Sequence, residues 1–154
     1  MGTRLGTGGL KLTVEKGSVI GLKLRNDPAA TRRVRAAVDR AAEACRLPAE
    51  ERFELKLAAT EAVTNALRMG AQRGPVEVSV ACREDSVDVN VSAPAPFTAS
   101  RTADDRRLEG ERGRGIALMI ALVDEIEFAR TPEGTRVRMR KRRAPAGEGD
   151  TALA

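Results

Sequence analysis

The feature that most constrains the fold is an apolar helical pattern over residues 53–70, FELKLAATEAVTNALRMG. At about 100° per residue, its apolar side chains form one broad arc, made up of Leu55, Ala59, Ala62, Val63, Ala66 and Leu67. The remaining narrow stripe carries Glu54, Glu61, Asn65 and Arg68. A helix this apolar is expected to be largely buried, so its polar stripe is either solvated at an edge or lines a pocket.

Glu61 and Asn65 are the pair on this stripe that could serve chemistry. They are four residues apart, so their side chains point the same way from adjacent turns. At an edge they would be ordinary surface groups. In a pocket they would offer a carboxylate and an amide to one ligand. Taken alone, the stripe favours the solvated edge, because short motifs often match by chance.

The composition narrows the chemistry and the partners. The chain has no histidine, which removes the commonest general base and the commonest zinc ligand, so proton transfer would fall to a carboxylate. The net charge of +5 permits nucleic-acid binding, but there is no Trp or Tyr and there are only three Phe, so a platform for stacking bases is missing. We therefore expect a solvated basic face or a face for an acidic protein partner, ahead of a nucleic-acid-binding face.

Length and hydropathy indicate one ordinary domain in a chain of 154 residues. No apolar run approaches the roughly 18 residues of a membrane span, and the N-terminus lacks the apolar region of a signal peptide. We expect a soluble, cytoplasmic protein that does not bind membranes. Cys45 and Cys82 lie far apart in apolar surroundings, which predicts buried free thiols ahead of a disulfide or a metal site.

Periodicity and turn signals predict the order β-β-α-α-β-β-α-β-β. The predicted strands are residues 10–14, 19–24, 76–80, 87–91, 126–128 and 137–139. The predicted helices start at Asp27-Pro28, at Pro48 and near Ile116, and they end near Arg46, at Gly70 and near Val123. Together they predict an α+β fold with helices layered on one face of a mixed, mostly antiparallel sheet.

Three segments are predicted to lie outside this core. Residues 1–9 are predicted to be a flexible N-terminus, and residues 142–154 a disordered basic and Gly/Ala-rich tail, on either side of a single domain at 10–141. Residues 98–110 are polar and poor in large apolar side chains, which predicts a mobile segment.

A glycine motif, Gly113-Arg114-Gly115, follows that segment and is predicted to begin the third helix. Glycines let backbone N–H groups approach a phosphate closely, and a helix N-terminus favours negative charge. The alternative is a hinge between a loop and a helix. A single Gly-x-Gly supports both interpretations equally.

Taken together, these motifs resemble those of a known family. Residues 60–66, TEAVTNA, resemble the N box of the Bergerat-fold (GHKL) ATPases, in particular the bacterial anti-sigma-factor serine kinases of the RsbW type. Residues 113–116, GRGI, resemble the second glycine box of that family, and residues 133–138, EGTRVR, resemble its closing Gly-Thr hairpin. Order and spacing agree from about Leu10 to Arg142. The resemblance implies the Bergerat fold.

The resemblance also implies a function, transcription regulation by partner switching. Family members bind Mg-ATP between the central helix and a lid, sequester a sigma factor, and phosphorylate a serine of a STAS-domain anti-anti-sigma factor. Many are homodimers. Carried over, residues 98–112 would be the lid, Glu61 the catalytic base, Asn65 a ligand of Mg²⁺ and nucleotide, Gly113, Arg114 and Gly115 the phosphate contacts, and Thr135 a pocket residue.

One motif of the family is missing. Its first glycine box, Asp-x-Gly-x-Gly, corresponds here to residues 92–97, SAPAPF, which supply neither Asp nor Gly in either plausible register. In the family, that Asp accepts a hydrogen bond from the adenine amino group. Losing a charged hydrogen bond costs roughly 1.5–3 kcal/mol, or ten- to over a hundredfold in affinity.

The sequence thus predicts an anti-sigma-factor-like regulator that binds a sigma factor, a STAS-domain antagonist or both, with weakened or lost ATP binding and kinase activity. The first alternative is an active ATP-dependent protein serine kinase that phosphorylates a STAS-domain antagonist. A basic nucleic-acid-binding module is a remote alternative. Whether the chain is an enzyme therefore stays open at this point.

Overall fold

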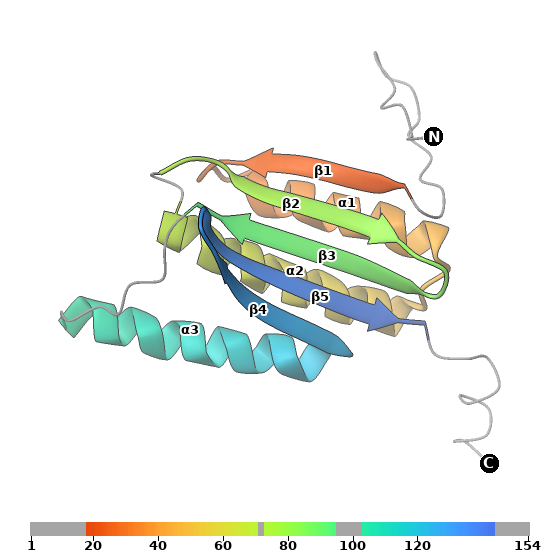
Figure 1. Cartoon of the computed structure of the whole chain (residues 1–154). Helices are drawn as coiled ribbons and strands as arrows, with labels where there is room; N and C mark the ends of the chain where they lie inside the picture. The colour runs from red at the N-terminus through yellow and green to blue at the C-terminus, as the bar shows by residue number, and fades with distance from the viewer. Residues whose placement is uncertain (1–17, 71–72, 95–102, 144–154) are drawn as a thin grey trace.

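The computed structural model describes residues 18–70, 73–94 and 103–143, with the backbone alone over 103–112. Five strands and three helices follow one another in this part of the chain (Figure 1). They are β1 (Val19–Leu24), α1 (Ala30–Ala44), α2 (Ala49–Gly70), β2 (Val76–Cys82), β3 (Ser86–Ala93), α3 (Ala103–Leu122), β4 (Glu125–Thr131) and β5 (Gly134–Arg142). None of these helices is long and apolar enough to cross a membrane.

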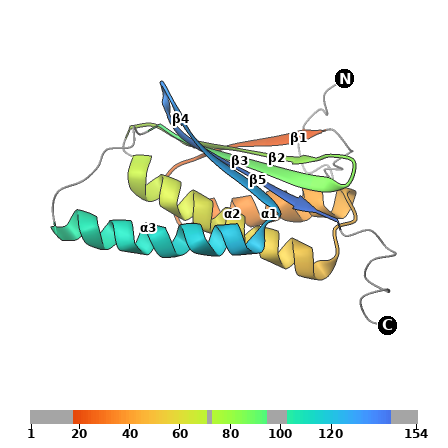
Figure 2. The ribbon, with the colours of Figure 1, turned by 60° about the horizontal axis from the view of Figure 1, so that its bottom comes forward.

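The strands form one sheet in the order β1-β2-β3-β5-β4, and every pairing in the described part is antiparallel. The three helices of the described residues all lie on one face of the sheet, and no described helix covers the other face (Figure 2). The predicted α+β layering is confirmed. The sheet was expected to be mixed and mostly antiparallel, and the described strands contain no parallel pair.

The core lies between the sheet and the helices, as the alternation of the strands predicts. Val78, Val80, Val89 and Val91 point toward the helices and are buried, and the apolar arc of α2 covers them with Leu55, Ala59 and Val63. The predicted hairpins are present. In the β4–β5 turn, Gly134 has a φ of 155°, a conformation that favours glycine, and its N–H donates to Thr131 Oγ1.

The region before the glycine motif differs from the prediction. Residues 103–110, predicted to be mobile, form the first turns of α3, which was predicted to begin only near Ile116. Gly113, Arg114 and Gly115 therefore lie in the middle of a helix rather than at its start. The predicted strand at residues 10–14 lies outside the described residues, and β5 continues to Arg142, where the tail was predicted to begin.

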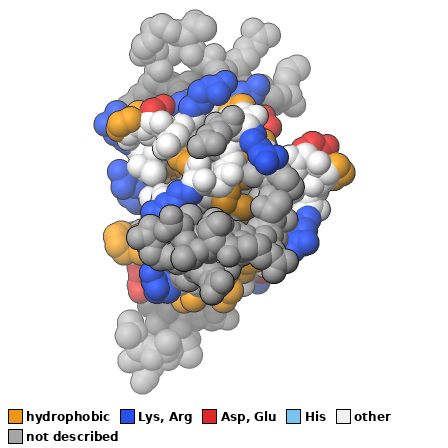
Figure 3. All heavy atoms as spheres, turned by 90° about the vertical axis from the view of Figure 1, so that its left-hand side faces the viewer, with side chains coloured by type: hydrophobic (Ala, Val, Ile, Leu, Met, Phe, Trp, Pro, Cys, Tyr) orange, Lys and Arg blue, Asp and Glu red, His pale blue; other side chains and the backbone are white. Residues whose placement is uncertain are grey.

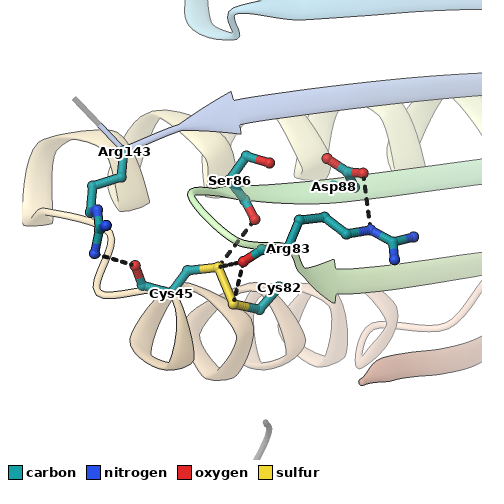
Figure 4. The surroundings of a disulfide bond; sticks show 6 residues. All are labelled: Cys45, Cys82, Arg83, Ser86, Asp88 and Arg143. Atoms are coloured by element: carbon teal, nitrogen blue, oxygen red, sulfur yellow. Dashed lines mark hydrogen bonds and ion pairs between the residues drawn. A yellow bond between two sulfur atoms is a disulfide. The ribbon is translucent and has the colours of Figure 1, made fainter. Parts of the chain in front are cut away.

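The prediction of free thiols is wrong, since Cys45 and Cys82 form a disulfide with their Cα atoms 5.5 Å apart (Figure 4). The fold brings the end of α1 beside the end of β2, although 37 positions separate the two cysteines. Cys45 Sγ also lies 3.1 Å from the carbonyl oxygens of Arg83 and Ser86. The disulfide thus ties the connection between α1 and α2 to the β2–β3 turn.

An ion cluster lies on the helix-free face of the sheet. Arg140 donates two hydrogen bonds to the buried Asp88 carboxylate, at 2.8 and 3.1 Å, and Arg83 Nε lies 3.4 Å from the same group. Burial raises the pKa of Asp88, but the hydrogen bonds and charges of Arg140 and Arg83 outweigh it, so the pKa lies below its ordinary value.

The lowered pKa of Asp88 predicts acid-sensitive stability. A carboxylate whose pKa is lower in the folded state contributes stability that is complete above its unfolded value, about 4, and is lost as pH falls through the folded value. The difference in unfolding free energy between the wild type and Asp88→Asn should therefore be largest above pH 5 and shrink below pH 4. Urea unfolding across this range measures it. Glu84→Gln, an exposed control in the β2–β3 turn, should show no such trend.

Candidate functional site

A cavity of about 440 Å³ opens between α2, α3 and the strands β3, β5 and β4. Its wall is mainly apolar and includes Ala62, Ala66, Met69, Val91, Ala93, Ile116, Met119, Phe128 and Val137. Among the described residues, the polar members of the wall are Asn65, Thr135, Arg130 and Arg136. The fold therefore brings three of the predicted site residues, Asn65, Gly113 and Thr135, to one cavity.

Asn65 lies on the side of α2 that faces this cavity. Only 7% of the residue is exposed, and its Oδ1 has no hydrogen-bond partner among the described residues. A buried acceptor left unpaired costs free energy, which indicates that a donor or a cation occupies this position when the site is filled. The pocket interpretation of the polar stripe of α2 is thus correct for Asn65.

Glu61 lies one turn earlier on α2, half-buried and against α3. A β-carbon added at Gly115 would overlap the Glu61 carboxyl, so the absence of a side chain at Gly115 allows the two helices to approach here. Glu61 itself is not part of the cavity wall, but it stands beside Gly115, close to the edge of the cavity. The structure therefore gives Gly115 a packing role that the sequence motif did not indicate.

The remaining residues of the glycine motif are placed differently. Gly113 lines the cavity, whereas Arg114 is exposed and does not. In the middle of an α-helix, each backbone N–H donates to a carbonyl four residues earlier and is not available to a phosphate. The predicted phosphate role of Gly113, Arg114 and Gly115 therefore requires that α3 open at this point.

The β4–β5 hairpin supplies Thr135, which the sequence interpretation placed in the pocket, and two arginines that it did not. Thr135 pairs with Arg130 and with Ala93, so these three residues share the helix-facing side of the sheet, where the cavity lies. Arg136 is also a residue of the cavity wall, but it pairs with Ser92 and Ala129, so its side chain starts on the opposite face of the sheet. The two arginines could have been found from their position on either side of the Gly-Thr turn.

The register of β3 decides which residue replaces the missing acidic residue of the first glycine box. Ala93 is buried and lines the cavity, whereas Ser92 lies on the opposite face of the sheet, beside Glu77 and Asn90. Ala93 therefore stands at the end of β3 where a carboxylate could face the cavity. No acidic side chain lines the cavity in the described part of the chain.

These residues fit a magnesium nucleotide only in part. Mg²⁺ is usually held by one or two protein oxygens together with substrate phosphates, and Asn65 Oδ1 could be such a ligand. The described residues contain no cluster of three or more His, Cys, Asp or Glu that would bind a metal without a nucleotide. The wall around Ala93 and Val91 offers no carboxylate to an adenine amino group.

Comparison with known proteins agrees with this geometry. Residues 24–141 match the family described as histidine kinase-like ATPase domain. The fold is similar to the crystal structure of the RsbU and RsbW domains of Rv1364c from Mycobacterium tuberculosis, with a TM-score of 0.60 and 21% sequence identity. That match covers 80% of this chain and 32% of the other, so this chain spans about a third of its structural relative.

No match was found among curated proteins. The family match nevertheless spans most of the chain and contains both hairpins, all three helices and every residue that lines the cavity. The chain therefore belongs to the family of histidine kinase-like ATPase domains, and its α+β structure is a Bergerat fold.

Proposed function

We propose that the chain is an anti-sigma-factor-like regulator in a partner-switching system, which binds a sigma factor, a STAS-domain anti-anti-sigma factor or both in the cytoplasm. Family membership and a fold similar to that of a structure containing an RsbW domain support this role. The observation that carries the proposal is that Ala93, and not an acidic residue, lines the cavity at the end of β3. The cavity keeps Asn65 but has an apolar wall where adenine recognition would need a carboxylate. Binding of protein partners is therefore retained more readily than tight ATP binding.

The surface for partners does not depend on the cavity. α1 is anchored by buried Val34, Ala37, Val38 and Ala41, and its outer side exposes Arg32, Arg33, Arg35 and Arg40. A basic helix of this kind attracts acidic partners and increases their association rate. The core beneath it consists of apolar side chains of α1, α2 and the sheet, so this surface forms without nucleotide.

The complex is therefore expected to form without Mg-ATP and to weaken as salt rises. Purified sigma factors and STAS-domain proteins from the same organism can be tested for binding with and without Mg-ATP. Between 50 and 300 mM salt, affinity should fall on the order of tenfold, because screening acts on exposed charges. Arg32→Glu with Arg35→Glu should weaken the complex, whereas the control Arg73→Glu should not. A complex that forms only with Mg-ATP would contradict the proposal.

The same observation predicts that ATP affinity can be increased by substitution. Ala93→Asp places a carboxylate at the end of β3 that faces the cavity, so Mg-ATP should bind at least about tenfold more tightly than to the wild type. Ser92→Asp, on the opposite face of the sheet, is the matched control and should leave affinity unchanged. Titration calorimetry measures both. Low-micromolar binding to the wild type would instead support an active kinase.

The active serine kinase is the second candidate function, and Glu61 with Asn65 is the observation in its favour. Phosphoryl transfer depends mainly on positioning and charge neutralisation, which a metal held at Asn65 would supply. The Glu61 carboxylate would accept the proton of the substrate serine while the γ-phosphoryl group passes from ATP to the serine oxygen and ADP leaves. Both side chains lie on the same side of α2, at or beside the cavity.

A further inference from the structure

The cavity has the size and the wall of a site for a small apolar molecule. Its volume of about 440 Å³ lies within the range of roughly 300–1,000 Å³ that is typical of ligand pockets. Two thioethers and one aromatic ring, from Met69, Met119 and Phe128, stand in a wall that is otherwise mainly aliphatic. Thioethers and aromatic side chains make favourable contacts with aromatic rings, so an aromatic body suits this wall.

The cavity lies towards one end of the molecule. Met69 is next to the last residue of α2, and Ala93 is the last residue of β3. Figure 3 views the molecule from this end, where hydrophobic side chains are visible beside basic ones on the described surface. An apolar ligand that approaches from this end therefore meets apolar as well as charged surface.

One polar side chain in this wall lacks a partner in the described part of the chain. Asn65 is more than nine-tenths buried, and its Oδ1 accepts no hydrogen bond from the described residues. Buried polar atoms of native proteins nearly always have partners. A hydroxyl or N–H group on a ligand satisfies this acceptor as a metal ion would, but without the substrate phosphates that Mg²⁺ usually needs.

The wall is poorly suited to a charged ligand. Within the described ranges no acidic side chain lines it, so a cation finds no opposite charge there. Arg130 is exposed and already has an interaction partner, and the side chain of Arg136 starts on the opposite face of the sheet, beside Ser92 and Ala129. An ion that moves from water into an apolar cavity without a partner pays a large desolvation cost. A neutral ligand is therefore favoured over an anion or a cation.

We propose that the cavity binds a neutral aromatic molecule that carries one hydroxyl or N–H group. Its rings lie against Met69, Met119 and Ile116, and its hydroxyl or N–H group donates a hydrogen bond to Asn65 Oδ1. Recognition needs neither a carboxylate at Ala93 nor phosphate contacts, so this ligand is not a nucleotide. The site goes beyond the proposed binding of protein partners and does not depend on it.

Four naphthalene probes that differ in one substituent test the proposal on the full chain. At neutral pH, 2-naphthol is uncharged and has the donor, 2-methoxynaphthalene lacks the donor, 2-naphthoate is an anion and 2-naphthylmethylamine is a cation. The chain has no Trp or Tyr, so naphthalene fluorescence reports binding without interference from the protein. 2-Naphthol should bind with one-to-one stoichiometry, at least about threefold more tightly than 2-methoxynaphthalene and at least about tenfold more tightly than either ion.

Two pairs of variants locate the site. Asn65→Leu should remove the preference for 2-naphthol over 2-methoxynaphthalene, whereas Asn90→Leu, on the opposite face of the sheet, should keep it. Ala66→Leu adds volume to the cavity wall and should weaken the binding of 2-naphthol at least about tenfold. Its control, Ala36→Leu on the exposed side of α1, should change that affinity less than about twofold.

Thermal unfolding of each variant separates a lost site from a lost fold, and the four probes test the wild type whatever the variants do. No saturable binding of 2-naphthol, equal affinity for all four probes, or equal loss in folded Ala66→Leu and Ala36→Leu would overturn the proposal. Displacement of 2-naphthol by Mg-ATP that binds more than about tenfold more tightly would also overturn it, because the cavity would then be a nucleotide site.

Discussion

Loss of the Cys45–Cys82 disulfide is expected to lower the free energy of unfolding by about 4 kcal/mol, roughly a thousandfold in the folding equilibrium. The cross-link closes a loop of 37 positions, and removing it restores freedom to the unfolded chain. A domain of this size is stable by only about 5–15 kcal/mol, so the reduced protein should unfold at a much lower denaturant concentration.

The surroundings of the disulfide make the prediction more specific. If Cys45 were reduced, its thiol could donate to the carbonyl oxygen of Arg83 or Ser86, each 3.1 Å from Sγ (Figure 4). Chemical reduction should therefore cost less stability than the double substitution Cys45→Ala with Cys82→Ala, which also leaves a void in the core. Both cysteines are fully buried, so a reductant reaches the bond only after local opening.

Guanidinium unfolding of oxidised, reduced and doubly substituted protein measures this order. The midpoints should fall in that sequence, and reduction should be slow in native buffer and fast in mild denaturant. Leu47→Ala, a core substitution near Cys45 that keeps the disulfide, separates loss of packing from loss of the cross-link: its unfolding should remain sensitive to reductant. Equal midpoints for oxidised and reduced protein would show that the disulfide contributes nothing.

The elements set by local pattern could be predicted from the sequence. The apolar arc of α2 and the alternation of the hairpins each depend on residues close together in the chain, and both are seen in the structure. The first half of α3 could not be predicted, because its charged residues and Gly110, followed by Gly113 and Gly115, have the composition of a loop. The helix continues through Gly115 where it packs on α2 beside Glu61, a contact that the local sequence does not contain.

The candidate site, like the fold, could be predicted from the sequence only in part. The spacing of Glu61 and Asn65 placed them on one side of α2, and that is where they lie. The disulfide could not be predicted, since two cysteines in apolar surroundings look the same whether or not the fold brings them together. The choice between Ser92 and Ala93 needed the register of β3 against β5, which pairs Ala93 with Thr135. The position of Arg130 in the cavity wall likewise depends on strand register, because β4 pairs Arg130 with Thr135 of β5.

For any phosphoryl transfer to a STAS-domain serine that the chain performs, Glu61→Gln is expected to lower the rate at least about a hundredfold, the usual contribution of a general base. Glutamine keeps the shape that packs against Gly115 but cannot accept the proton of the serine hydroxyl. Among the described residues no carboxylate lines the cavity wall, so none there could replace Glu61. Stability and partner affinity should therefore change little while transfer is lost.

Radiolabel transfer from ATP to a STAS-domain partner, measured beside partner affinity, tests this separation. Glu50→Gln is the matched control, since Glu50 is an exposed carboxylate on the first turn of α2, far along the helix from the cavity. It should transfer phosphate at the wild-type rate. If Glu61→Gln does so too, the carboxylate is there to pack against α3 and not to take a proton. If Glu61→Gln loses transfer and partner binding together, the substitution has disturbed the contact between α2 and α3, which would make Glu61 a structural residue of the partner surface.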